Sequence, residues 1–229
     1  MLRAADENKD QTYFLAGVAR QHFAGVLFPL GALTKPQVRT LATEAGLPNH
    51  GRKDSTGICF IGERPFAEFL AEHVPPQPGA IETPEGEVLG QHPGLQFFTL
   101  GQRKGVRVGG VRGGIESPWY VVAKLAERNV LVVAQDAEHP LLMSSQVQTA
   151  PFHWLRHDIA DGGELLARIR HRQPLQPCRI RREPNGTVLA AFSTPQRAVA
   201  AGQYLALYQG DECLGCGEIA TSVTMATFF

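Results

Sequence analysis

A run of prolines near residue 77 limits what this chain can fold into. Pro75-Pro76-Gln77-Pro78-Gly79 cannot continue a helix, because proline lacks an amide hydrogen and both residue types favour turns. Before the run, residues 1–75 carry apolar side chains at helical spacing; after it, short β-type stretches alternate with turns. The sequence therefore predicts two differently built parts and a domain boundary close to this run.

Three helices are expected before the prolines. The first covers residues 11–22, with Asp10 as its N-cap. The second begins after Thr34, which caps it, and ends at Gly46. The third runs from Pro65 to His73.

Short strands are expected after the prolines, because β-branched and aromatic residues cluster between turn residues. The candidates are Ala80–Glu82, Glu87–Gly90, Trp119–Lys124, Val130–Gln135, Leu165–Arg172, Cys178–Arg182, Val188–Phe192, Gln203–Tyr208 and Glu212–Ala220. The predicted fold class is α+β and mostly antiparallel. It has an N-terminal helical segment, a central α/β section and a C-terminal β-barrel of the six-stranded type.

The composition is that of an ordinary globular protein. Acidic and basic residues balance at 22 each, so total charge does not attract the chain to nucleic acid or membrane. No apolar run approaches the roughly 20 residues that span a bilayer, and the first residues do not resemble a signal peptide. The four cysteines are unevenly placed and do not suggest a disulfide framework. We expect a cytoplasmic protein.

Cys59 lies in the segment that is richest in chemically active residue types, Lys53–Gly62. Nearby positive charge and amide dipoles can lower the pKa of a thiol and make it a nucleophile. The alternative is a small buried side chain between Ile58 and Phe60. On the residues alone, the buried position is the simpler interpretation.

Two basic stretches could bind phosphates. Six arginines and no acid lie between Leu165 and Arg182, and Arg168, Arg170 and Arg172 would share one face of a strand. Residues 101–114 hold four basic side chains among six glycines. The alternative is a solvated barrel face and a flexible hairpin, and the neutral total charge leaves both interpretations open.

Cys213-Leu214-Gly215-Cys216 could be half of a zinc site or a redox pair. Zinc would need two further ligands, and the sequence has no second Cys-x-x-Cys. Strand-like residues follow the motif, whereas a redox motif normally opens a helix. Two coincidental strand cysteines and no metal site are the preferred interpretation.

Several blocks in order resemble the tRNA-specific 2-thiouridylase family over essentially the whole chain. These blocks are Asn8–Gln11 with Tyr13–Leu15, Leu27–Gly31, Lys35–Arg39, Lys53–Gly62, Thr99–Gly105, Pro118–Val122 and Leu131–Gln135. The resemblance implies a sulfurtransferase that inserts sulfur at C2 of the wobble uridine in tRNA. In that family a PP-loop domain uses ATP and Mg²⁺ to adenylate the uridine.

The family resemblance also implies roles for individual residues. Cys59 matches the persulfide carrier, which is loaded by a sulfur-relay protein or cysteine desulfurase and resolved by a second cysteine through a disulfide. The matched tRNA contacts are Lys9, Asp10, Gln11, Arg170, His171 and Gln203. His171 stands where an aromatic residue is common in the family, so stacking is expected of it rather than ionisation.

The chain departs from the family in what it lacks. It contains no Ser-Gly-Gly sequence, which opens the family's phosphate-binding loop, and it has neither the family's first catalytic cysteine nor that cysteine's neighbouring aspartate, so Cys59 has no partner cysteine from that motif. We therefore expect the C-terminal two-thirds of such an enzyme, without the N-terminal PP-loop ATP domain, without ATP-binding residues and inactive alone. Residues 1–25 and 48–74 would be a remnant of the catalytic domain, residues 26–47 and 75–147 the central domain, and residues 148–229 a tRNA-binding barrel. The alternative is a tRNA-binding module without catalysis.

Overall fold

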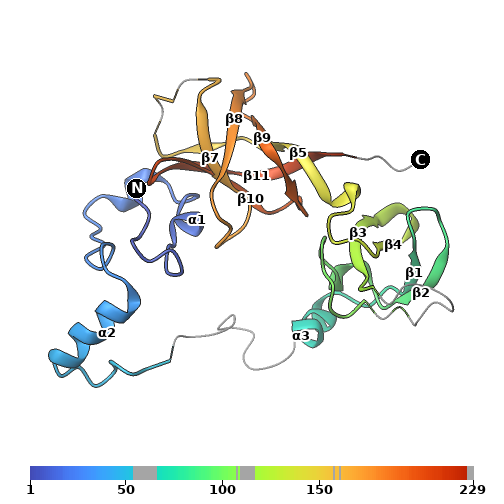
Figure 1. Ribbon diagram of the computed structural model, residues 1–229, viewed down its shortest axis with the longest axis horizontal. Coiled ribbons are helices and arrows are strands. Elements are labelled where there is room, and N and C mark those ends of the chain that lie inside the picture. Colours follow the sequence, from blue (N-terminus) through green and yellow to red (C-terminus); the bar gives the residue numbers. More distant parts are fainter. Residues whose placement is uncertain (54–65, 107, 109–116, 157, 160, 226–229) are drawn as a thin grey trace. The chain divides into compact units, whose positions relative to one another are not determined.

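The computed structural model describes residues 1–53, 66–106, 108, 117–156, 158–159 and 161–225 (Figure 1). Two compact units make up the chain. The barrel unit consists of Met1–Asp54, Gln146–Thr194 and Ala201–Ser222, and the central unit of Ser55–Ser145, Pro195–Ala200 and Val223–Phe229. The domain limits expected from the sequence stay a prediction.

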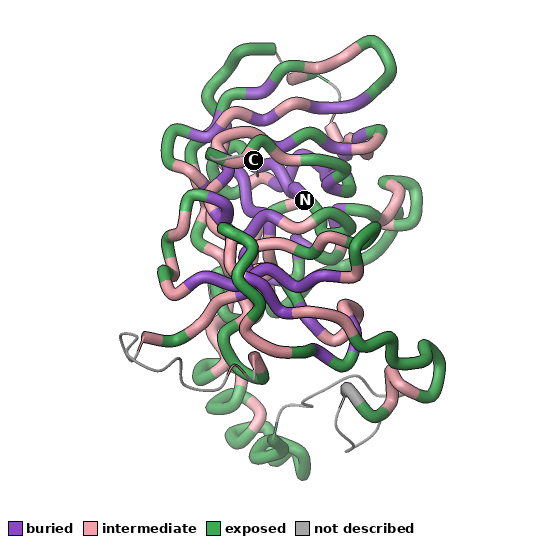
Figure 2. Tube along the Cα trace, turned by 90° about the vertical axis from the view of Figure 1, so that its right-hand side faces the viewer, coloured by how far each residue is buried: buried purple, intermediate pink, exposed green. Residues whose placement is uncertain are grey.

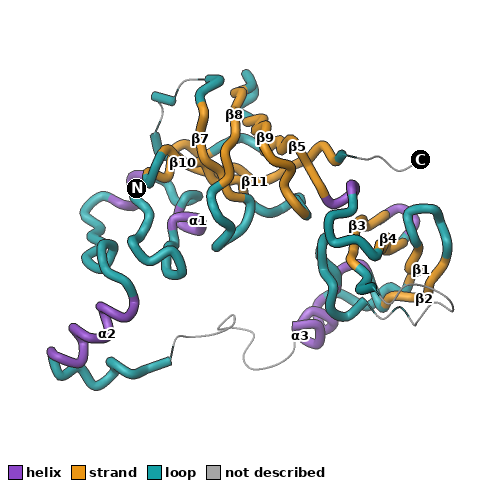
Figure 3. The backbone as a smooth tube through the Cα atoms, in the orientation of Figure 1, coloured by secondary structure: helices purple, strands orange, loops and turns teal. Residues whose placement is uncertain are grey.

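A closed six-stranded β-barrel forms most of the barrel unit, as the sequence predicts (Figure 3). The strands follow the order β10-β7-β8-β9-β5-β11, and pairing of β10 with β11 closes the ring. A short strand, β6, pairs with β11 from outside this ring. Their bounds are β5 Met143–Thr149, β6 His153–Trp154, β7 Glu164–Arg168, β8 Gln176–Arg182, β9 Val188–Arg197, β10 Tyr204–Gln209 and β11 Glu212–Thr224.

Alternation of side chains along the strands explains why these sequences form a barrel. In β8, Cys178 and Ile180 are buried while Arg179 and Arg181 are exposed, because successive strand residues point to opposite faces. Figure 2 shows buried and more exposed positions following one another along the trace. Every second residue of β8 thus fills the interior, whereas four successive residues of β10 are buried.

A four-stranded sheet with the order β2-β1-β4-β3 organises the central unit. Its strands are β1 Gly79–Glu82, β2 Val88–His92, β3 Tyr120–Leu125 and β4 Val130–Ala134. Strands β1 and β4 run parallel, whereas β1–β2 and β3–β4 are antiparallel. Every residue of β4 is buried, since Leu131 and Val133 pack in one apolar cluster and Val130, Val132 and Ala134 in another.

Helices are few and short. They are α1 Thr12–Leu15, α2 Lys35–Glu44 and α3 Phe66–His73, with single 3₁₀ turns at Arg20–Phe23, Leu95–Phe97, Ala126–Arg128 and Pro140–Leu142. The predicted α2 is confirmed: the amide and hydroxyl of Thr34 donate to Gln37 Oε1, and Gly46 adopts φ 69° just beyond its end. Every helix in the described part of the chain is too short or too polar to cross a bilayer.

Three expectations about local structure were wrong. The helix expected over residues 11–22 stops at Leu15, and the backbone at Ala19 is extended. Strand β7 ends at Arg168 instead of reaching Arg172. Strands β5 and β6 were not expected at all, because β5 is mostly polar and offers no clear apolar alternation.

Candidate nucleic-acid interface

The side chain of Tyr13 joins three segments that are far apart in sequence. It lies on α1 and is buried, and its hydroxyl is 3.2 Å from the carbonyl oxygen of Ile169 and 3.1 Å from that of Tyr204. The Tyr204 amide also points to this hydroxyl, at 3.3 Å. Burial raises the pKa of Tyr13, so the hydroxyl keeps its proton.

This junction brings the candidate tRNA contacts of the sequence to one region of the barrel unit. Arg170 and His171 follow Ile169 directly, and Gln203 precedes Tyr204. Lys9, Asp10 and Gln11 precede α1. Among these six residues only Asp10 is buried, so the other five reach the surface at least in part.

Asp10 is an interior anchor. Its side chain is 1% exposed, and its Oδ2 lies 3.3 Å from Nη1 of Arg168 and 3.7 Å from Nε of Arg3. The other oxygen, Oδ1, accepts hydrogen bonds from the amide and the hydroxyl of Thr12 at 3.1 and 2.8 Å. This carboxylate therefore ties the segment before α1 to strand β7, and its charge is balanced inside the protein.

Arg168 is as deeply buried as its partner, with 4% of its side chain exposed. Its guanidinium carbon lies 5.1 Å from the centroid of the Tyr208 ring, and the Tyr208 hydroxyl is 3.2 Å from Oγ1 of Thr12. Burial raises the pKa of Tyr208, which therefore stays neutral. These contacts make Arg168 part of the interior and not part of a phosphate-binding face.

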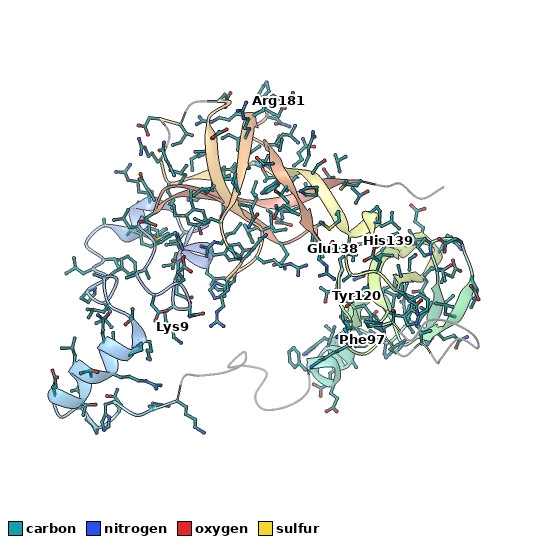
Figure 4. All side chains as sticks on the ribbon, viewed as in Figure 1. Lys9, Phe97, Tyr120, Glu138, His139 and Arg181 are labelled. Carbon is teal, nitrogen blue, oxygen red and sulfur yellow. The ribbon has the colours of Figure 1, made fainter. Side chains whose placement is uncertain are left out.

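The expectation of a shared arginine face is thus wrong. Arg168 points inward and pairs with Asp10, 158 residues earlier in the chain. Arg172 is not on the strand at all, because it lies in a turn with φ 63° beyond the end of β7. Three further arginines of the set form ion pairs with acids. These pairs are Arg179–Glu164 at 3.2 Å, Arg181–Glu183 at 2.7 Å and Arg182–Asp161 at 3.5 Å. Figure 4 places Lys9 and Arg181 well apart on the unit.

His171 forms an aromatic group with α1. Its ring centroid is 4.6 Å from that of Phe14 and 6.3 Å from that of Tyr13. Burial lowers the pKa of His171, and the positive charges of Arg172 and Arg168 lower it further. A neutral imidazole with an aromatic neighbour fits the expected stacking role better than an ionic one.

The glycine-rich basic loop of the central unit begins with a fixed turn. Gln102 closes it, since its Oε1 accepts from the Thr99 amide at 3.0 Å and its Nε2 donates to the Lys104 carbonyl at 2.8 Å. Arg197 donates to the carbonyl oxygens of Gly101 and Ala137 at 3.3 and 2.6 Å. Arg103 and Lys104 are exposed, whereas Arg107 and Arg112 lie outside the described residues.

The described cysteines are core residues. Cys178, Cys213 and Cys216 are free and buried, and burial raises their pKa to about 12, 11 and 12. Thiols of this kind are neutral near pH 7 and poor nucleophiles. No group of three or more potential metal ligands occurs among the described residues. Cys59, the candidate persulfide carrier, lies outside the described residues.

The sequence reasoning missed Tyr13, Phe14 and Arg168 as residues that shape this region. Tyr13 and Phe14 were part of a family block, but only their helical spacing was interpreted. Arg168 was grouped with its neighbours because a single sequence does not show which distant acid will meet it.

Comparisons with known proteins agree with the fold and order of these parts. Three family models match in succession: a tRNA methyl transferase HUP domain at residues 1–63, a tRNA methyl transferase PRC-barrel domain at residues 67–135, and an aminomethyltransferase beta-barrel domain at residues 144–219. Relatives named tRNA-specific 2-thiouridylase MnmA are 50% identical in Alcanivorax borkumensis and 50% in Shewanella amazonensis, over 94% and 97% of this chain. The relative in Xanthomonas campestris is 48% identical over 97% of the chain.

Over almost its whole length the chain is similar to proteins named tRNA-specific 2-thiouridylase. It spans 59% of the length of each of these three relatives. The expectation that the nucleotide-binding domain is missing needs correction in part, because the HUP domain model matches residues 1–63. A Ser-Gly-Gly sequence is nevertheless absent from the 229 residues.

Proposed function

We propose that this chain binds the anticodon arm of tRNA and carries the sulfur for 2-thiolation of the wobble uridine. The relatives named tRNA-specific 2-thiouridylase support this reaction class. The observation that carries the RNA-binding part is the junction at Tyr13, where three separate segments with tRNA contacts proposed by resemblance adjoin one hydroxyl group.

The residues of this region would contact different parts of the RNA. Lys9 and Arg170 would contact phosphates, since cationic side chains supply most of the affinity for a nucleic-acid backbone. Gln11 and Gln203, both exposed, can donate to and accept from sugar and base edges. The Asp10 side chain is buried, so we propose that it acts by holding Lys9 and Gln11 in place.

Cys59 is the proposed sulfur carrier. A sulfur-relay protein or cysteine desulfurase would load it as a persulfide, and ATP with Mg²⁺ would activate the C2 oxygen of uridine as an adenylate. The terminal sulfur would then bond to C2 while AMP leaves with the oxygen. A second cysteine, supplied with the PP-loop domain, would attack Sγ of Cys59, forming a disulfide as the S–S bond to the new thiouridine breaks.

A thiolation assay tests this proposal. Unmodified tRNA, ATP, Mg²⁺ and a desulfurase relay are incubated with this chain, with and without a supplied PP-loop domain, and nucleosides are read by mass spectrometry. Thiouridine that is lost with Cys59→Ala but kept with Cys178→Ala supports the sulfur-carrier role, because Cys178 is a buried thiol of β8. Thiouridine formed by the chain alone would refute the expectation that the chain is inactive without the PP-loop domain.

The second candidate is a tRNA-binding module without catalysis. The convergence of candidate contacts on the barrel unit is compatible with it, since binding does not require Cys59. It predicts salt-sensitive tRNA binding that survives Cys59→Ala, with no thiouridine in either arm of the assay. That pair of results would favour the module over the enzyme.

A further inference from the structure

Phe14 is a large aromatic side chain that the fold leaves exposed. Its neighbours on α1, Thr12 and Tyr13, are buried, yet 59% of Phe14 is accessible to solvent. Its ring lies 5.4 Å from that of Tyr13 at 81°, and 4.6 Å from that of His171 at 40°. An exposed phenylalanine that is supported from two sides presents a preformed apolar surface.

The support under this ring is rigid. Tyr13 is held at its hydroxyl by the backbone at Ile169 and Tyr204, and Thr12 is held by two hydrogen bonds to the buried Asp10. The residues before and beside Phe14 are therefore fixed to the barrel. Little conformational freedom would be lost when a ligand contacts such a ring, which favours binding.

His171 contributes a second ring that can stack. It lies in the turn after β7, and its Nδ1 is buried and has no hydrogen-bond partner in the described part of the chain. Burial and the neighbouring arginines favour the neutral imidazole. A neutral ring can take part in a stack without the desolvation cost of a charged one.

The charges around the two rings fit an anionic ligand. Arg170 and Arg172 flank His171 in sequence, and the positive charge of Arg172 acts on its ring. The negative charge of Asp10 also acts on the ring, but Arg168 and Arg3 neutralise it. Aromatic rings beside cations are the usual site for an unpaired base with its phosphate.

We propose that Phe14 and His171 form a stacking site for one unpaired base of a bound RNA. This inference rests on the proposed tRNA binding and adds to it Phe14, as the residue that bears the stacked base. An unpaired base would lie against the exposed Phe14 ring, while the phosphate next to it would lie near Arg170 or Arg172. The site would accept any base, because every base has a stacking face.

Fluorescence anisotropy with a labelled anticodon stem-loop, at several salt concentrations, tests the inference. Phe14→Leu should weaken binding about tenfold, as expected for loss of one stacked base, with an unchanged salt slope. Phe14→Trp should keep the affinity, and its added indole fluorescence should be quenched when RNA binds. Phe28→Leu is the matched control, because Phe28 is a similarly exposed phenylalanine of the same unit, at 55%.

The outcomes separate the two proposals. If the unchanged chain does not bind the stem-loop, the proposed tRNA binding fails, and the stacking site fails with it. If the unchanged chain binds but Phe14→Leu binds equally well, only the stacking site is refuted. Equal losses in Phe14→Leu and Phe28→Leu, or an unquenched indole in Phe14→Trp, would also overturn it.

Discussion

Replacing Asp10 by asparagine tests whether the buried ion pair holds the N-terminal segment on the barrel. Asparagine keeps the shape and an oxygen for Thr12, so the change removes the charge that faces Arg168 at 3.3 Å. Both side chains are at most 4% exposed, so the guanidinium would be left buried and uncompensated. Breaking one half of a buried pair costs about 3–5 kcal/mol. For a chain of this size that is a fall in Tm of roughly 6–20 °C.

The assay is thermal unfolding of the barrel unit followed by Trp154 fluorescence. A Trp119→Phe background leaves Trp154 as the one tryptophan, since the chain has two. Asp211→Asn is the matched control: it removes a carboxylate 3.4 Å from Arg3, but Asp211 is 78% exposed. An exposed ion pair contributes about 0–1 kcal/mol, so this control should melt within a few degrees of the parent.

A double variant distinguishes the ion pair from other effects of the change. Asp10→Asn combined with Arg168→Met removes both charges and should regain at least half of the lost stability, because no buried charge is left alone. The reasoning is refuted if Asp10→Asn melts with the parent. It is also refuted if the double variant is less stable than the single one.

Four further predictions concern the buried cysteines, the central unit and the junction at Tyr13. In a Cys59→Ala chain no thiol should react quickly with Ellman's reagent at pH 8, because a pKa of about 11 for Cys213 leaves about one thousandth of it as thiolate; a fast-reacting thiol would contradict its burial. Because these thiols have a higher pKa in the folded chain than in the unfolded one, their contribution to the free energy of unfolding is complete below about pH 8.5. It should fall as pH rises toward 11, which denaturant unfolding at several pH values would measure. Gly101→Ala should destabilise the central unit by about 1–2 kcal/mol, because φ is +77° and the new Cβ would lie 2.9 Å from Ala198 Cβ. Gly90→Ala, with open space around the new Cβ, should be harmless; both are measured by thermal unfolding followed by Trp119 fluorescence in a Trp154→Phe background. Tyr13→Phe should cost about 1–3 kcal/mol and weaken RNA binding, since it leaves buried backbone groups without their partner; unchanged stability would argue against the junction.

Sequence patterns predicted the barrel well where side chains alternate strictly. Strand β8 is an example, because arginines alternate with Cys178 and Ile180 and only the latter fit the interior. Strand β5 was missed because it buries polar residues such as Thr149, whose hydroxyl is satisfied by the amide of Val188. That partner lies 39 residues away, and local periodicity does not reveal it.

The candidate site was predictable as a set of positions but not as an arrangement. The family resemblance supplied Lys9, Arg170 and Gln203 as separate points in the sequence. Their proximity depends on the Tyr13 hydroxyl and the buried Asp10 carboxylate, which bond to Ile169 and Arg168, more than 150 residues away. Contacts over such distances in sequence depend on the whole fold. The sequence therefore showed how many arginines lie between Leu165 and Arg182, but not which of them are interior and which are on the surface.

The attachment of the N-terminal segment to the barrel has a consequence for how such proteins can be recombined. The carbonyl of Met1 accepts from the Cys213 amide, Leu2 forms a β-bridge with Glu212, and Tyr13 lies in the same apolar cluster as Cys213. A chimera that takes the barrel strands from one relative and the N-terminal segment from another would therefore bring together two surfaces that do not match. The two stretches belong to one compact unit, although most of the chain separates them.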